Sequence, residues 1–84
     1  MSRARKTLQT VLNGKSDASI RFRDLRGLLK ALGFDERVRG DHHIYTREDV
    51  VEIINLQPRG SLAKPYQVKQ VRQLVQAYHL GEGL

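Results

Sequence analysis

The stretch DERVRGDHHIYTREDVVEIINL, residues 35 to 56, decides the fold. Within it, DERVR and HHIYTR are separated by Gly40-Asp41, a dipeptide that suits the tight turn of a β-hairpin. The segment VVEIINL (50–56) is rich in β-branched residues and predicts a third strand. Asp49 before this apolar run would also suit the start of a helix. We expect the strand, and with it three antiparallel strands.

On both sides of this stretch, apolar residues recur at helical spacing. Residues 3–12 and 22–32 predict two helices before the strands, and Gly33 can end the second. Pro65 suits the first turn of a last helix that extends to residue 80. The expected order is α-α-β-β-β-α, an α+β fold in which helices 23–32 and 66–80 cover one face of the sheet.

Length and composition describe one small domain of 84 residues. The absence of cysteine excludes disulfides, thiolate chemistry and cysteine-type zinc sites, and it suits a cytoplasmic protein. No apolar stretch approaches the roughly 18 residues that a membrane span needs. The net charge of +6 favours a polyanionic partner, although charge alone does not distinguish RNA, DNA or an acidic protein.

The adjacent histidines His42 and His43 allow three interpretations. A metal site is the weakest, because only His79 remains as a third imidazole and neighbouring strand residues point to opposite faces. We therefore expect no metal and no other cofactor. The second interpretation is a pair of ordinary histidines on a half-exposed strand. The third is a proton-transfer site, since imidazole titrates near neutral pH.

The alternation of side chains along a strand separates the two histidines. If Ile44 faces the core, His42 faces it too. His43 then shares the open face of the sheet with Tyr45 and Arg47, in a basic setting that suits general acid–base work. The same argument makes His42 a packing residue.

Three segments in order resemble the HicA-type (YcfA-like) toxin family: RGDHHIYTRE, NLQPRG and AKPYQVKQVRQLVQAY. That family shows a Gly-Ser-His-His-aromatic stretch, a strand that ends in proline, and a closing helix introduced by Lys-Pro. The resemblance covers residues 23 to 80. The first helix lies outside it, so we describe residues 1–18 as a helical extension and 19–81 as the core of a single domain.

This resemblance implies an mRNA interferase, the toxin of a type II toxin–antitoxin system, which a HicB-like antitoxin protein neutralises. It also implies a fold like that of double-stranded-RNA-binding domains. The family's functional histidine lies on the strand after the glycine, and His43 matches that place better than His42. Asp41 stands where the family usually has serine. A carboxylate there favours the charged imidazole and repels phosphate, which can weaken nuclease activity.

Cleavage of RNA without metal can use the neighbouring 2′-hydroxyl as the nucleophile. His43 is the expected base, and His42 is a possible acid without further support. Tyr45 could stack on an unpaired base. The cations expected to contact phosphate are Arg39, Arg47, Arg59, Lys64, Lys69 and Arg72. His79 is expected to be a favourable charge at a helix C-terminus.

Two other functions fit the same sequence. One is a non-catalytic RNA-binding module of the same fold, which Asp41 favours. The other is a winged-helix-like DNA-binding protein, since three helices and a small sheet can be arranged in that way. The connector NGKSDAS is long for the turn of a helix-turn-helix motif, which argues against DNA binding.

Overall fold

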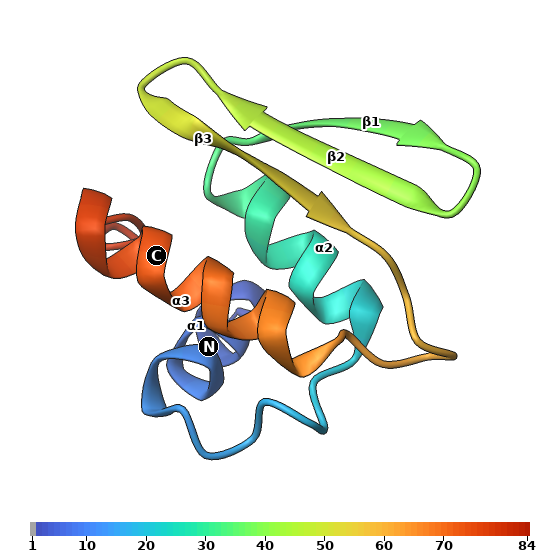
Figure 1. The fold of residues 1–84 in the computed structure, drawn as a ribbon. Coiled ribbons are helices and arrows are strands. Elements are labelled where there is room, and N and C mark those ends of the chain that lie inside the picture. Colours follow the sequence, from blue (N-terminus) through green and yellow to red (C-terminus); the bar gives the residue numbers. More distant parts are fainter. Residues whose placement is uncertain (1) are drawn as a thin grey trace.

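The computed structural model describes residues 2–84 and contains three helices and three strands (Figure 1). In chain order they are α1 (Arg3–Asn13), α2 (Phe22–Ala31), β1 (Asp35–Arg39), β2 (His42–Arg47), β3 (Val50–Leu56) and α3 (Pro65–Tyr78). The predicted α+β fold with a three-stranded antiparallel sheet is therefore confirmed, and residues 50–56 form a strand. No helix within residues 2–84 is long and apolar enough to cross a membrane.

The sheet has the strand order β1-β2-β3, with both neighbouring pairs antiparallel. The last pair of the β1–β2 hairpin is Arg39 with His42. Gly40 makes the turn between them with a φ of 59°, a left-handed conformation that favours glycine. The hairpin turn and the end of β3 lie at the same end of the sheet as the first turn of α2 (Figure 1).

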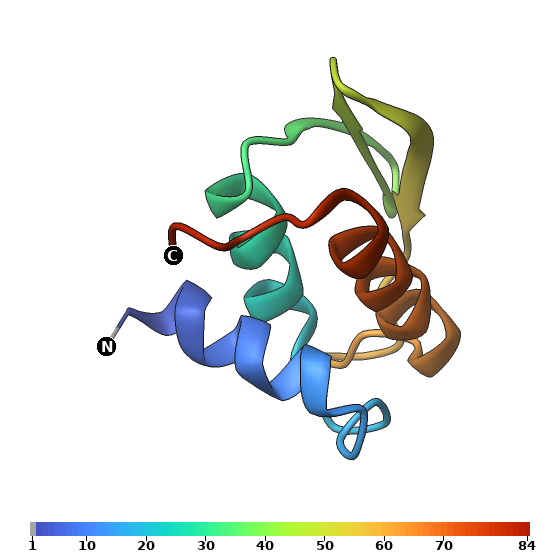
Figure 2. The ribbon, with the colours of Figure 1, turned by 90° about the vertical axis from the view of Figure 1, so that its left-hand side faces the viewer.

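The molecule has three layers. Helices α2 and α3 cover one face of the sheet, as the spacing predicted, and α1 packs against these helices on the side away from the sheet (Figures 1 and 2). Leu28 of α2, Val71 of α3 and Ile54 of β3 are all fully buried in one core, which Leu8 of α1 also joins. Burying each such side chain contributes about 1.5–3 kcal/mol.

The predicted orientation of β2 is wrong. Tyr45 is 0% exposed and packs in the core, so Tyr45 and His43 face the helices, whereas Ile44 and His42 lie on the open face. The physical reason is the pairing of Tyr45 with Glu36 on β1. Its ring buries a large apolar area while its hydroxyl donates to the Glu36 carboxylate, so the tyrosine is buried without leaving a polar group unpaired.

Side chains of α3 cover the outer edge of β3. The buried Gln67 accepts a hydrogen bond from the backbone N–H of Gln57 and donates one to the carbonyl of Asn55, each at 3.2 Å. Near the other end, the Tyr78 hydroxyl accepts from the N–H of Val51 at 3.3 Å. These contacts satisfy part of an otherwise unpaired strand edge and fix α3 against the sheet.

Candidate functional site

His43 lies at the start of β2 on the helix-facing side of the sheet. Its ring meets the Phe22 ring edge-on, with centroids 4.9 Å apart and an interplanar angle of 70°. Phe22 is the first residue of α2. The His43 side chain is only 13% exposed, so the ring is held by its surroundings rather than free in solvent.

The carboxylate of Glu36 lies beside this histidine. Its Oε2 is 3.4 Å from Nδ1 of His43 and also accepts a hydrogen bond from the Tyr45 hydroxyl. Arg26 of α2 donates to both carboxylate oxygens, at 2.9 and 3.0 Å. One carboxylate therefore joins the first two strands to α2.

The electrostatics of this cluster follow from the same contacts. The hydrogen bonds from Arg26, with a further one from Tyr45, lower the pKa of Glu36 from 4.5 to about 2 against the opposing effect of burial. The pKa of Tyr45 is raised, first by burial and then by its hydrogen bond to Glu36. At neutral pH the cluster thus holds a charged carboxylate and a neutral phenol.

A pocket of about 420 Å³ opens beside His43. Its apolar wall is formed by Phe22 and Pro58, and its other lining residues are Arg21, Arg23, Arg26, Gly60 and Ser61. We call this space the His43 pocket. The backbone N–H of Phe22 donates to the carbonyl of Ser61 at 3.0 Å, which docks the loop after β3 onto the first turn of α2.

The three arginines that line the His43 pocket differ in whether they already pair with a carboxylate. Arg26 is committed to Glu36, whereas Arg21 is exposed and Arg23 has only a 3.9 Å approach to Asp24. Two arginines can therefore turn toward a ligand in the pocket. A histidine next to two such cations is an arrangement that can bind a phosphodiester and accept the proton of a neighbouring hydroxyl.

His42 lies on the other face of β2 and is 49% exposed, so the prediction that it packs in the core is wrong. Its Nδ1 is 3.2 Å from the Asn55 side-chain oxygen, and its Nε2 is 3.7 Å from Asp41. Because the two histidines point to opposite faces, His42 is poorly placed to act on a phosphate that His43 contacts.

Asp41 belongs to the surroundings of His42, not of His43. Gln57 donates to its carboxylate at 2.8 Å and lowers the pKa of Asp41, and Lys64 in turn donates to the Gln57 side chain at 3.1 Å. The His43 pocket is not lined by Asp41. The expected repulsion of phosphate by this carboxylate therefore acts outside the pocket.

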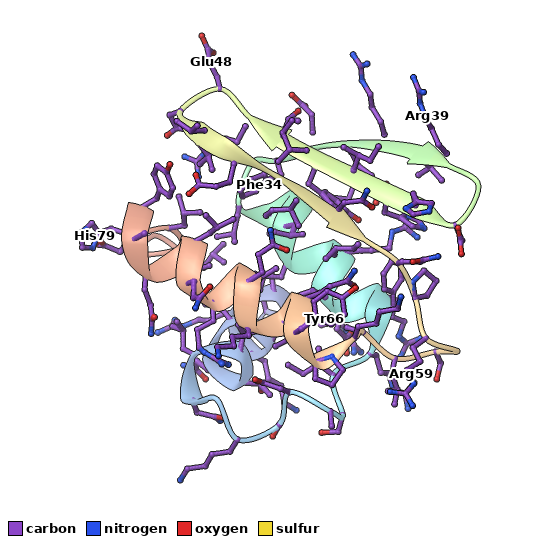
Figure 3. All side chains as sticks on the ribbon, viewed as in Figure 1. Phe34, Arg39, Glu48, Arg59, Tyr66 and His79 are labelled. Carbon is purple, nitrogen blue, oxygen red and sulfur yellow. The ribbon has the colours of Figure 1, made fainter. Side chains whose placement is uncertain are left out.

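Three of the cations expected to contact RNA lie toward the hairpin end of the sheet. Arg39 projects from the sheet away from the helices, and Arg59 is exposed on the loop whose neighbouring residues line the His43 pocket (Figure 3). Lys64 immediately precedes α3. Lys69 is exposed on α3 itself.

The remaining residues of that set are used elsewhere. Arg47 pairs with Asp49 at 2.9 Å, four residues from His43 and so roughly 13 Å along the strand. Arg72 makes two hydrogen bonds to Asp17, at 2.8 and 3.1 Å, and ties α3 to the connector after α1. Tyr45 is buried, so the expectation that it stacks on a base is wrong.

Sequence reasoning missed the residues that complete the site. They are Arg21, Phe22, Arg23 and Arg26 at the start of α2, and Glu36 on β1. The run RFRDLR did carry a signal, because it places three arginines around the start of an expected helix. His79 lies outside the site: it is the C-cap of α3, with a left-handed φ of 54°, and it projects from the end of that helix (Figure 3).

Within residues 2–84, no group of three or more His, Asp or Glu side chains is close enough together to hold a metal ion. No family model, curated protein or solved structure matches the chain.

Proposed function

We propose that this protein binds RNA and cleaves it with His43 as the general base. The observation that carries the proposal is the placement of His43: one ring nitrogen faces a charged carboxylate, and the ring borders a pocket with two uncommitted arginines. Such a site has the proton acceptor and the positive charge that transfer of a phosphodiester requires.

The chemistry uses groups that RNA itself supplies. His43 accepts the proton of a 2′-hydroxyl, whose oxygen attacks the adjacent phosphorus. The new bond from phosphorus to the 2′ oxygen forms as the bond to the 5′ oxygen breaks, which yields a 2′,3′-cyclic phosphate. The 5′ oxygen leaves with a proton from water or from the imidazolium. Arg21 and Arg23 stabilise the charge on the phosphate oxygens. DNA lacks the 2′-hydroxyl and would not react in this way.

The resemblance to HicA-type toxins extends this proposal to a biological role. The protein would act on mRNA in the cytoplasm as the toxin of a type II toxin–antitoxin pair, and a HicB-like antitoxin would neutralise it. Three cations suit an acidic surface on that partner. Arg39 lies beside the hairpin turn, Lys64 donates to the Gln57 side chain that contacts Asp41, and Arg59 is exposed on the loop after β3. Overexpression should arrest growth, and co-expression of the antitoxin should restore it.

A second candidate is RNA binding without cleavage. The low exposure of His43 favours it, because a ring that is 13% exposed offers little surface to a substrate. Under this alternative the arginines of the His43 pocket would hold the RNA backbone, and the histidine would serve packing.

The test compares RNA and DNA oligonucleotides of one sequence with purified protein in EDTA. We expect the protein to cleave the RNA but not the DNA, and to leave cyclic-phosphate ends. His43→Ala should lower the cleavage rate by about 10²-fold or more. His79→Ala is the matched control, since that exposed histidine caps α3 away from the pocket. Cleavage by His43→Ala at the wild-type rate would contradict the proposal. RNA binding without any cleavage by the wild type would select the second candidate.

A further inference from the structure

We propose that Glu36 is a positioning residue for His43: its carboxylate keeps the hydrogen of the neutral ring on Nδ1 and leaves Nε2 as the proton acceptor at the His43 pocket. This inference rests on the proposed function for its catalytic consequence. The tautomer itself can be measured whether or not the protein cleaves RNA.

Nδ1 of His43 faces Oε2 of Glu36 at 3.4 Å, and an ionised carboxylate can only accept hydrogen bonds. Nδ1 must therefore carry the hydrogen for the contact to be favourable. Within residues 2–84, Nε2 has no hydrogen-bond partner, so its lone pair remains free for a substrate proton. The edge-on contact with Phe22 restrains the plane of the ring.

Glu36 itself is held firmly by its neighbours. Its side chain is 10% exposed and receives two hydrogen bonds from Arg26 and one from Tyr45. Its lowered pKa keeps the carboxylate ionised at any pH near neutrality. A carboxylate fixed by three donors, two of them on the Oε2 that faces His43, defines the direction of the histidine hydrogen bond better than a mobile surface carboxylate would.

A substitution of Glu36 can separate a positioning role from a merely structural one. The ion pair with Arg26 links β1 to α2 and would stabilise the fold without any effect on the histidine tautomer. Glu36→Gln keeps the size of the side chain but removes the charge that requires a hydrogen on Nδ1. Because Oε2 faces His43 and also accepts from Arg26 and Tyr45, an amide NH₂ in its place can donate to Nδ1 but no longer accepts from those two donors. The substitution therefore removes the restriction on the tautomer and also weakens the contact with Arg26, so its folded fraction is measured first.

The first experiment measures ¹⁵N chemical shifts of the histidine rings by NMR at a pH at which they are neutral. In the wild type, His43 should carry its hydrogen on Nδ1. In Glu36→Gln it should shift toward the Nε2–H form, while exposed His79 stays unchanged as an internal reference. A wild-type His43 with its hydrogen on Nε2 would overturn the inference, even if the variant did not fold.

The second experiment measures kcat and KM for the cleavage of one RNA oligonucleotide by each variant. Glu36→Gln should lower kcat by about 10- to 100-fold with little change in KM, and it should cause no further loss in the His43→Ala background. Lys30→Gln is the control, because Lys30 approaches Glu36 at 3.9 Å from the exposed side and does not contact His43. An unchanged kcat in Glu36→Gln would refute the positioning role. A wild type that never cleaves, with the Nδ1–H tautomer intact, would refute the proposed function and the catalytic role but leave the structural assignment standing.

Discussion

Acid should destabilise this protein through one identifiable carboxylate. The pKa of Glu36 falls from 4.5 to about 2 on folding, chiefly because Arg26 donates two hydrogen bonds to it. Each pKa unit corresponds to about 1.4 kcal/mol, so the shift represents about 3 kcal/mol of folding free energy. The side chain is 10% exposed, so solvent screens this ion pair less than it would screen a pair on the open surface. Against a total stability of about 5–15 kcal/mol, the effect is large.

The direction in which stability changes with pH follows from proton linkage. Because the pKa is lower in the folded state, the unfolded state binds a proton first as the pH falls. The stabilisation is fully present above about pH 4.5 and is lost progressively as the pH falls toward 2. Glu36→Gln has no proton to bind at this position. The difference in unfolding free energy between the wild type and this variant should therefore shrink across that window.

Urea unfolding followed by circular dichroism at pH 7, 5, 4 and 3 measures this difference. Arg26→Gln supplies the control, since it leaves Glu36 in place but removes the main cause of its lowered pKa. In that background the loss between pH 5 and 3 should be much smaller. A wild-type-minus-Glu36→Gln difference that stays constant from pH 7 to 3 would refute the account of the cluster.

Three further outcomes follow from the structure. Gln67→Leu removes two hydrogen bonds at the edge of β3 and should therefore lower the unfolding free energy, measured by urea titration, by about 1–3 kcal/mol. The control Gln73→Leu, at an exposed position of α3, should change this free energy little. Arg72→Gln should lower the melting temperature but leave RNA cleavage unchanged, and a selective loss of RNA binding would contradict its structural role. His43→Ala should destabilise by about 1–2 kcal/mol and His42→Ala by less than about 0.5, since only His43 packs on the helix side; equal effects would argue against the observed orientation.

The fold was predictable because its signals are local. The change from helical to alternating spacing after Gly33, the Gly40 turn and the proline at 65 each act over a few residues. Even the ambiguous segment 50–56 forms a strand, because its β-branched side chains suit a sheet in which it pairs with β2.

The orientation of β2 was not predictable by the same means. Both faces of the strand carry a bulky apolar side chain, Ile44 on one and Tyr45 on the other, so alternation alone leaves the choice open. What decides it is Glu36, which pairs with Tyr45 across the hairpin and satisfies its hydroxyl. Glu36 can be identified as the partner of Tyr45 only once the register of the hairpin is known.

The arginines of the His43 pocket were missed for a related reason. Arg21 and Arg23 are about twenty residues from His43 in the chain, and no spacing rule joins the start of a helix to the start of a strand. The link is the loop after β3, whose Ser61 carbonyl accepts from the backbone of Phe22. Contacts of this kind depend on loop conformation, which sequence periodicity does not report.

Because His43 faces the helices, a substitution of this histidine affects the packing of the small domain as well as any activity. A histidine on the open face would be independent of the core, and its loss would affect activity alone. Here the ring shares its environment with Glu36 and Tyr45, which also connect β1, β2 and α2. One carboxylate therefore supports the fold and directs the imidazole, so variants at this cluster must be compared at equal folded fraction. Arg26→Gln and Glu36→Gln both remove the ion pair and so lower the stability of the cluster, but only Glu36→Gln changes the group that faces Nδ1 of His43, and the contrast between them separates the two contributions.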